Sequence, residues 1–244
     1  MFDRVADRYD ETRGGEERGT QLAEDILPWL TPGLTLEVGV GTGLVSVALC
    51  RAGVDVLGVD ISAGMLAHAH RRLGGRVFRG DAQALPLPDG LCANVAFVWM
   101  LVFVDDPGAA LREAARVSRA GGRVVVVGGR PAADVTEVDA LTAPLDVLRP
   151  ARPQDLDDRV PALAATAGLR LRHRGLTRGQ ALEQVPAQAA QTLQERQPAW
   201  LADVDRTMWT STVQPVIDAL RAMPDPDRPR QYLQRNTVTV FDRP

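Results

Sequence analysis

Short apolar runs alternate with segments of helical periodicity through the first half of the chain. Strands are predicted at residues 34–40, 54–60, 76–79, 92–99 and 123–127, and helices at residues 20–30, 44–53, 62–73 and 106–119. Thr20, Ser62 and Asp106 are the expected N-caps of three of these helices. Strands that alternate with helices in this way predict βαβ units and an open, doubly wound, Rossmann-like α/β sheet.

The second half of the chain has a different pattern. It predicts a helix at residues 155–167, a strand at 169–176, a helical stretch at 180–223 and a last strand at 232–241. We therefore expect a mostly parallel, seven-stranded sheet with an antiparallel last strand. The whole chain, residues 1–244, is expected to form a single domain. Residues 1–130 would be its cofactor-binding core, and about 180–229 a helical insertion that could cover a substrate as a lid.

Residues 37–43, Glu-Val-Gly-Val-Gly-Thr-Gly, join the first predicted strand to the next helix. Glycines let the backbone turn sharply and let a ligand approach closely, and the N-terminus of the helix offers free N–H groups. A dinucleotide-binding loop needs a small residue where this chain has Leu44, and the carboxylate of Glu37 would repel a pyrophosphate. A ligand that carries ammonium and sulfonium groups would not be repelled by this carboxylate.

Two further acidic residues follow the next two predicted strands. Asp60 ends the second strand and can accept hydrogen bonds from both hydroxyls of a ribose. NAD also offers that pair of hydroxyls, so Asp60 alone does not identify the cofactor. Asp81 follows the third strand and could accept the amino group of adenine, while the N–H of Ala82 could serve a ring nitrogen. Ligands of open α/β sheets bind at this edge, where the strands end.

Several segments, taken together, resemble the motifs of a known enzyme family. They are residues 36–43 (Leu-Glu-Val-Gly-Val-Gly-Thr-Gly), 58–62 (Gly-Val-Asp-Ile-Ser), 80–88, 116–122 and the opening segment 2–10. The chain resembles the class I S-adenosylmethionine-dependent methyltransferases, and most of all the group that includes the ubiquinone and menaquinone biosynthesis methyltransferases. The likeness covers roughly the first half of the chain.

The resemblance implies S-adenosyl-L-methionine as the cofactor and a defined set of residues around it. That set is Tyr9, Arg13, Glu37, Gly39, Gly41, Thr42, Gly43, Asp60, Ile61, Met65, Asp81, Ala82, Gln83 and Val98. The glycine loop would surround the methionine moiety, and Ile61 and Met65 would flank the adenine. Tyr9 and Arg13 would close over the methionine end, although a surface charge explains Arg13 equally well.

No catalytic residue is assigned from the sequence. Methyl transfer is an in-line displacement for which the cofactor supplies the electrophile, so the protein mainly positions the acceptor. Relatives often carry a histidine after the fourth strand, but this chain has Val102 and Phe103 there. Asp105 could act as a base, but a loop carboxylate near a helix cap is the better explanation of it.

The expected methyl acceptor is a small apolar or aromatic molecule. Trp99, Met100 and Phe103 follow the fourth strand, where the methyl group should point. Trp200 and Trp209 lie in the predicted insertion and could cover an acceptor, although helix packing also explains them.

Composition limits which partners, which catalytic chemistry and which cellular location fit the sequence. The 244 residues carry a net charge of −3, which gives no overall attraction to nucleic acid or to an anionic membrane. All 28 basic residues are arginines, so Schiff-base lysine chemistry is excluded. The two cysteines, the absence of a predicted metal cluster and the charged first ten residues favour a cytoplasmic protein without a signal peptide. The oligomeric state is left open.

Two alternative functions remain at this stage. One is a nucleic-acid methyltransferase, whose phosphates could be followed by a stripe of four arginines, although a charged, solvated strand edge explains that stripe more simply. The stripe consists of Arg170, Arg172, Arg174 and Arg178. The missing histidine suggests instead a cofactor-binding protein that lacks catalysis.

Overall fold

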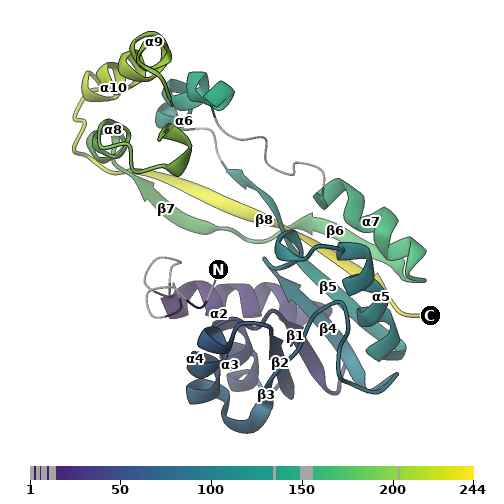
Figure 1. Ribbon diagram of the computed structural model, residues 1–244. Helices are drawn as coiled ribbons and strands as arrows, with labels where there is room; N and C mark the ends of the chain where they lie inside the picture. The colour runs from purple at the N-terminus through teal and green to yellow at the C-terminus, as the bar shows by residue number, and fades with distance from the viewer. Residues whose placement is uncertain are drawn as a thin grey trace. The chain divides into compact units, whose positions relative to one another are not determined.

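A computed structural model (Figure 1) describes residues 3, 6, 10, 15–133, 136–148, 156–202 and 204–244. The chain divides into two compact units. The first comprises Met1–Pro131, Asp155–Arg178 and Asn236–Pro244, and the second comprises Ala132–Gln154 and Gly179–Arg235. Each unit has its own hydrophobic cluster.

The strands form one sheet whose order is β3-β2-β1-β4-β5-β8-β6. The strands are β1 (Thr35–Val38), β2 (Val56–Asp60), β3 (Val77–Arg79), β4 (Cys92–Val98), β5 (Ser118–Ala133), β6 (Arg170–Leu176) and β8 (Arg230–Asp242). Neighbours from β3 to β5 pair in parallel, whereas β6 and β8 are antiparallel. The predicted fold class, a mostly parallel α/β sheet with an antiparallel last strand, is confirmed.

Helices cover both faces of the sheet in the first unit. Along β5, Val124 and Val126 belong to one hydrophobic cluster, and Val125 and Val127 to another. This alternation is what a strand buried on both faces requires. The first cluster includes α5 (Pro107–Val117) and α7 (Leu156–Thr166), and the second includes α2 (Gly15–Ile26) and α3 (Leu44–Arg51). The helix α4 (Ala63–Leu73) also packs against α3, as Figure 1 shows.

Two of the three expected helix caps are confirmed. Ser62 accepts from the backbone of Met65 at the start of α4, and Asp106 accepts from that of Ala109 at the start of α5. The prediction for Thr20 is wrong, because α2 begins at Gly15 and Thr20 lies inside it. Two glutamates in the first turn favour the earlier start, and the Thr20 hydroxyl donates to a carbonyl one turn back.

The second unit contains a helical cluster and one short strand that the sequence pattern did not predict. Its helices are α6 (Glu137–Thr142), η5 (Ala143–Leu148), α8 (Pro186–Gln194), η6 (Ala199–Leu201), α9 (Arg206–Met208), η7 (Trp209–Val213) and α10 (Gln214–Arg221). Residues 180–184 were expected to be helical, but they form the eighth strand, β7 (Gln180–Gln184), which pairs with β8. The partner strand decides this conformation, because the five residues alternate too briefly to favour either structure alone.

Candidate functional site

The carboxyl ends of four parallel strands surround a cavity of about 390 Å³ in the first unit. Its walls come from the loop after β1, the ends of β2 and β3, and the segment after β4. Of the predicted cofactor residues, Gly39, Gly41, Asp60, Ile61, Met65, Asp81, Ala82 and Gln83 line it. The structure therefore brings together residues that are up to 44 positions apart in the sequence, because parallel strands end at one edge.

The loop after β1 makes its turn through three glycines with positive φ. Gly39, Gly41 and Gly43 have φ values of 74°, 56° and 86°, a region that other residues enter only with strain. A Cβ added at Gly39 would lie 2.7 Å from the Cβ of Met100. The first glycine is therefore needed both for the turn and for the close approach of the segment after β4.

Asp60 connects the end of β2 to this glycine loop. One carboxylate oxygen accepts from the backbone N–H of Gly41 at 2.8 Å, and the other accepts from Ser62 at 2.9 Å. A carboxylate oxygen has more than one lone pair, so these bonds orient the group and leave acceptor capacity toward the cavity. Asp60 thus stabilises the glycine loop, and it is also a candidate to bind the two hydroxyls of a ribose.

A tight turn after β3 presents Asp81 and Ala82. The backbone N–H and the side-chain amide of Gln83 both donate to Oδ1 of Asp81, at 2.9 and 3.3 Å. The oxygen of the same side-chain amide accepts from the backbone N–H of Asp106, the cap of α5, at 2.9 Å. These bonds fix the turn from two sides, so its carboxylate and backbone N–H are preorganised.

Glu37 lies in the interior rather than on the cavity wall. It is 2% exposed, and the hydroxyl of Ser46 in α3 donates to its carboxylate. Burial raises the pKa of Glu37 to about 7, the negative charge of Asp60 raises it further, and the Ser46 hydrogen bonds oppose both effects. The carboxyl group therefore changes its charge near neutral pH.

Trp99, in the segment that follows β4, is held by its backbone conformation and by two side-chain contacts. Its backbone has φ 53°, a left-handed conformation that is costly for a bulky side chain. The indole N–H donates to Oδ1 of the buried Asn236 at 3.0 Å, and the guanidinium of Arg18 lies 3.7 Å from the ring centroid. Met100 and Phe103 line the cavity beside it.

Other predicted residues lie away from this cavity. Thr42 and Val98 line a smaller neighbouring pocket, and Gly43 packs against α4. Trp200 and Trp209 pack against the core of the second unit, so a lid at residues 180–229 stays a prediction. Tyr9 and Arg13 lie outside the described residues.

Sequence reasoning missed one cation and one anchoring acid near the glycine loop. Arg18, on α2, lines the smaller pocket, and no sequence motif distinguishes it from an ordinary helix-surface arginine. Asp10 accepts from the Thr42 hydroxyl at 2.5 Å and from Arg72 at 2.6 Å. Its place in the opening segment that resembles the family was the only available signal.

Asp105 also lies on the cavity wall and is exposed. Its position keeps open the role of a base, which the sequence alone could not separate from a helix-end carboxylate.

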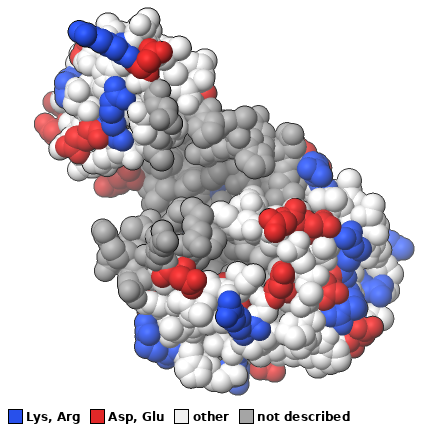
Figure 2. All heavy atoms as spheres, in the orientation of Figure 1, with Lys and Arg blue, Asp and Glu red and all other residues white. Residues whose placement is uncertain are grey.

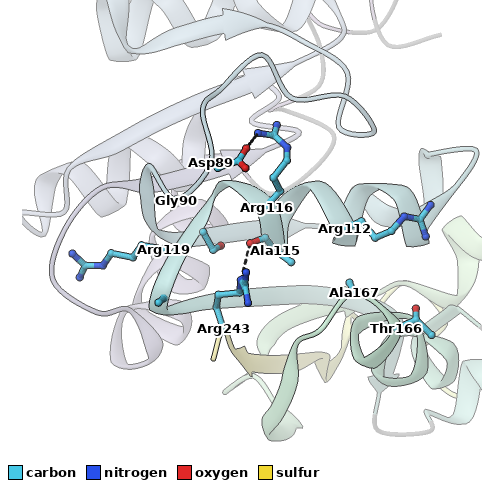
Figure 3. A pocket seen from close by; sticks show the side chains of 11 residues that line it. Asp89, Gly90, Arg112, Ala115, Arg116, Arg119, Thr166, Ala167 and Arg243 are labelled. Carbon is cyan, nitrogen blue, oxygen red and sulfur yellow. Dashed lines mark hydrogen bonds and ion pairs between the residues drawn. The ribbon is translucent and has the colours of Figure 1, made fainter.

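A second hollow, of about 600 Å³, lies where α5 ends and β5 begins (Figure 3). Three of its arginines, Arg112, Arg116 and Arg119, point in different directions in this view. Arg116 binds Asp89 at 2.6 Å, and Arg243 donates to a backbone carbonyl at 3.0 Å. Guanidinium groups that diverge and bind the protein itself do not form an anion site. The cavity of about 390 Å³ at the strand ends is therefore the better candidate for the functional site.

The arginine stripe near β6 is largely neutralised. Arg172 binds Asp242 at 3.1 Å, and Arg174 binds Asp158 at 2.8 Å. Arg178 binds both Glu24 and Asp25 at 2.7 Å. Acidic and basic side chains are likewise intermixed on the face shown in Figure 2. Within the described residues, no helix combines the length and the apolar character that crossing a bilayer requires.

Comparisons with known proteins agree with this geometry. Residues 36–126 match the family model of a methyltransferase domain. A demethylmenaquinone methyltransferase of Mycobacterium marinum is 40% identical over 131 residues, which cover 52% of this chain and 56% of that protein. The chain thus spans about half the length of the curated relatives that it matches.

Solved structures share the fold at low identity. The [4+2]-cyclase SpnF superposes with a TM-score of 0.61 and 18% identity, covering 100% of this chain and 94% of that one. A geranyl diphosphate C-methyltransferase of Streptomyces coelicolor A3(2), solved with S-adenosyl-L-homocysteine, has a TM-score of 0.52 and 16% identity, covering 91% of this chain and 77% of that one.

Proposed function

We propose that this chain is an S-adenosylmethionine-dependent methyltransferase that transfers the methyl group of that cofactor to a quinone-like small molecule. The observation that carries the proposal is the cavity at the strand ends, where Asp60, Asp81 and the glycine loop meet. The Mycobacterium marinum relative is a demethylmenaquinone methyltransferase, which supports a quinone-like acceptor.

The residues of the cavity fit the nucleoside part of S-adenosyl-L-methionine. Asp60 would accept the ribose hydroxyls, Asp81 the adenine amino group, and the N–H of Ala82 would serve a ring nitrogen. Ile61 is 60% exposed at the rim and Met65 is buried, so an adenine ring could lie between them. The preformed turns mean that little backbone ordering accompanies binding.

The cofactor, when bound, supplies an electrophilic methyl group. The protein's own part is to align the acceptor and to exclude water, and alignment alone is worth about 7 kcal/mol at effective molarities of ~10⁵ M. Trp99, Met100 and Phe103 give the acceptor side an apolar wall. Among the described residues that line the cavity, Asp105 is the titratable one on that side, so it is the candidate to take the proton of a hydroxylated ring.

Two measurements test the proposal. Calorimetry should show binding of S-adenosylhomocysteine and none of NADH, and labelled cofactor should transfer its methyl group to reduced demethylmenaquinone. Binding without transfer to this or to any other reduced quinone would remove the proposed acceptor class and favour a cofactor-binding protein. Transfer to RNA instead would identify a nucleic-acid methyltransferase. Failure of S-adenosylhomocysteine to bind would overturn the proposal itself.

A further inference from the structure

Trp99, on the wall of the candidate cofactor cavity, is held by contacts from separate elements of the first unit. Its backbone N–H donates to the carbonyl of Val127 on β5 at 2.8 Å, and its indole N–H donates to Oδ1 of Asn236 on β8 at 3.0 Å. The guanidinium of Arg18 lies over the ring. A left-handed backbone at a bulky residue persists only where its surroundings impose it, so these contacts together select one conformation of Trp99.

Asn236 is itself fixed by a reciprocal pair of hydrogen bonds with Thr177. Its backbone N–H donates to the Thr177 hydroxyl at 2.9 Å, and its carbonyl accepts from the Thr177 backbone N–H at 2.9 Å. Both residues are buried, and they follow the last pair of the ladder between β6 and β8, Leu176 with Thr237. The side-chain amide of Asn236 therefore meets the indole from a backbone that cannot shift without breaking these bonds.

The bond to Asn236 also decides what Trp99 offers a ligand. An indole has a single N–H to donate, and here Asn236 accepts it, so the ring presents its apolar carbon surface. Met100 and Phe103 continue this apolar wall, while the residues that suit the nucleoside come from the ends of β2 and β3. Two aromatic rings prefer offset or edge-to-face contact, so the tilt of the indole determines how a flat ring lies against it.

Resting on the function proposed above, we propose that Asn236 is a positioning residue for the methyl acceptor. It is not among the described residues that line the cavity, so it acts through Trp99. By holding the indole N–H, Asn236 sets the tilt of the surface on which the acceptor ring lies. The cofactor is bound by other residues, so loss of this hydrogen bond should weaken the acceptor and leave the cofactor in place.

The test measures the acceptor and the cofactor separately. Asn236→Leu keeps a side chain of similar size but cannot accept the indole N–H. With reduced demethylmenaquinone its KM should rise about 3- to 10-fold, the range for one neutral hydrogen bond, while the Kd of S-adenosylhomocysteine from calorimetry stays within about 1.5-fold. Asn236→Asp keeps an acceptor oxygen and should return the KM to within about 2-fold of the wild type.

Two further variants separate an effect through Trp99 from an effect on the fold. Thr239→Val changes another buried polar residue of β8, one that is not among the described residues lining the cavity, and should alter neither constant. Trp99→Phe keeps an aromatic ring without the N–H, so adding Asn236→Leu to it should raise the KM no further. A rise of the same size with and without the indole would mean that Asn236 acts on the fold, which would overturn the proposal.

Other outcomes also decide. An unchanged acceptor KM in Asn236→Leu would overturn the proposal, and so would a change confined to the Kd of S-adenosylhomocysteine, which would put Trp99 on the cofactor side. The proposed function survives both results, because the wild type still transfers the methyl group. If Asn236→Leu does not fold, Trp99→Phe decides, since it must raise the acceptor KM at least as much. If the wild type methylates no reduced quinone, the proposed function fails and this inference fails with it.

Discussion

At the scale of single residues, the buried carboxyl group of Glu37 makes the stability of the chain depend on pH. Its pKa is about 7 in the folded chain, against an ordinary value of 4.5, so the folded state binds this proton more tightly. Between these two values, unfolding releases the proton, and stability therefore falls as the pH rises through the window. The group alone makes the chain about 3 kcal/mol less stable above pH 7 than below pH 4.5.

Replacing Glu37 by glutamine should remove this dependence. Glutamine can keep the hydrogen bond to Ser46 without a charge in the interior. We expect Glu37→Gln to be about 1–3 kcal/mol more stable than the wild type near pH 8 and to differ much less near pH 5, measured by urea unfolding. The exposed Glu16→Gln is the control. A gain of the same size at both pH values would contradict a raised pKa.

At the scale of elements, the turn from β1 to α3 needs a glycine at position 39 for two reasons. The backbone there has a positive φ, and the neighbouring side chain leaves no room for a Cβ. Gly39 and Gly53 both have positive φ, 74° and 86°, but only Gly39 has a side chain against it, that of Met100. Gly53→Ala should cost about 1 kcal/mol from backbone strain alone. Gly39→Ala should cost about 1–3 kcal/mol more, because the new methyl group overlaps Met100. Equal losses of unfolding free energy would show that Met100 moves aside freely.

The positions of some candidate site residues could be predicted from the sequence, and those of others could not. The strand-end positions of Asp60 and Asp81 follow from periodicity and from the rule that parallel strands end at one edge. The inward position of Glu37 could not be predicted, because it depends on a hydroxyl nine residues later on the packed face of α3. Arg18 and Asn236 could not be predicted either. Both contact Trp99, Arg18 from α2 and Asn236 from β8. These residues are far apart in the sequence, so no local sequence pattern indicates that they meet.

At the scale of the whole molecule, each unit has a separate core, and the described residues that line the candidate cofactor cavity belong to the first unit. A ligand stabilises only the cooperative unit that binds it. We therefore expect calorimetric melting to show two transitions. S-adenosylhomocysteine at about 100 times its Kd should stabilise one of them by about 2.7 kcal/mol and leave the other in place.

Tryptophan fluorescence can show which unit the shifted transition belongs to. The first unit holds Trp29 and Trp99, and the second holds Trp200 and Trp209. In the double variant Trp200→Phe/Trp209→Phe, fluorescence reports on the first unit alone, and its transition should be the one that the ligand shifts. One transition that moves as a whole would show that the units unfold together.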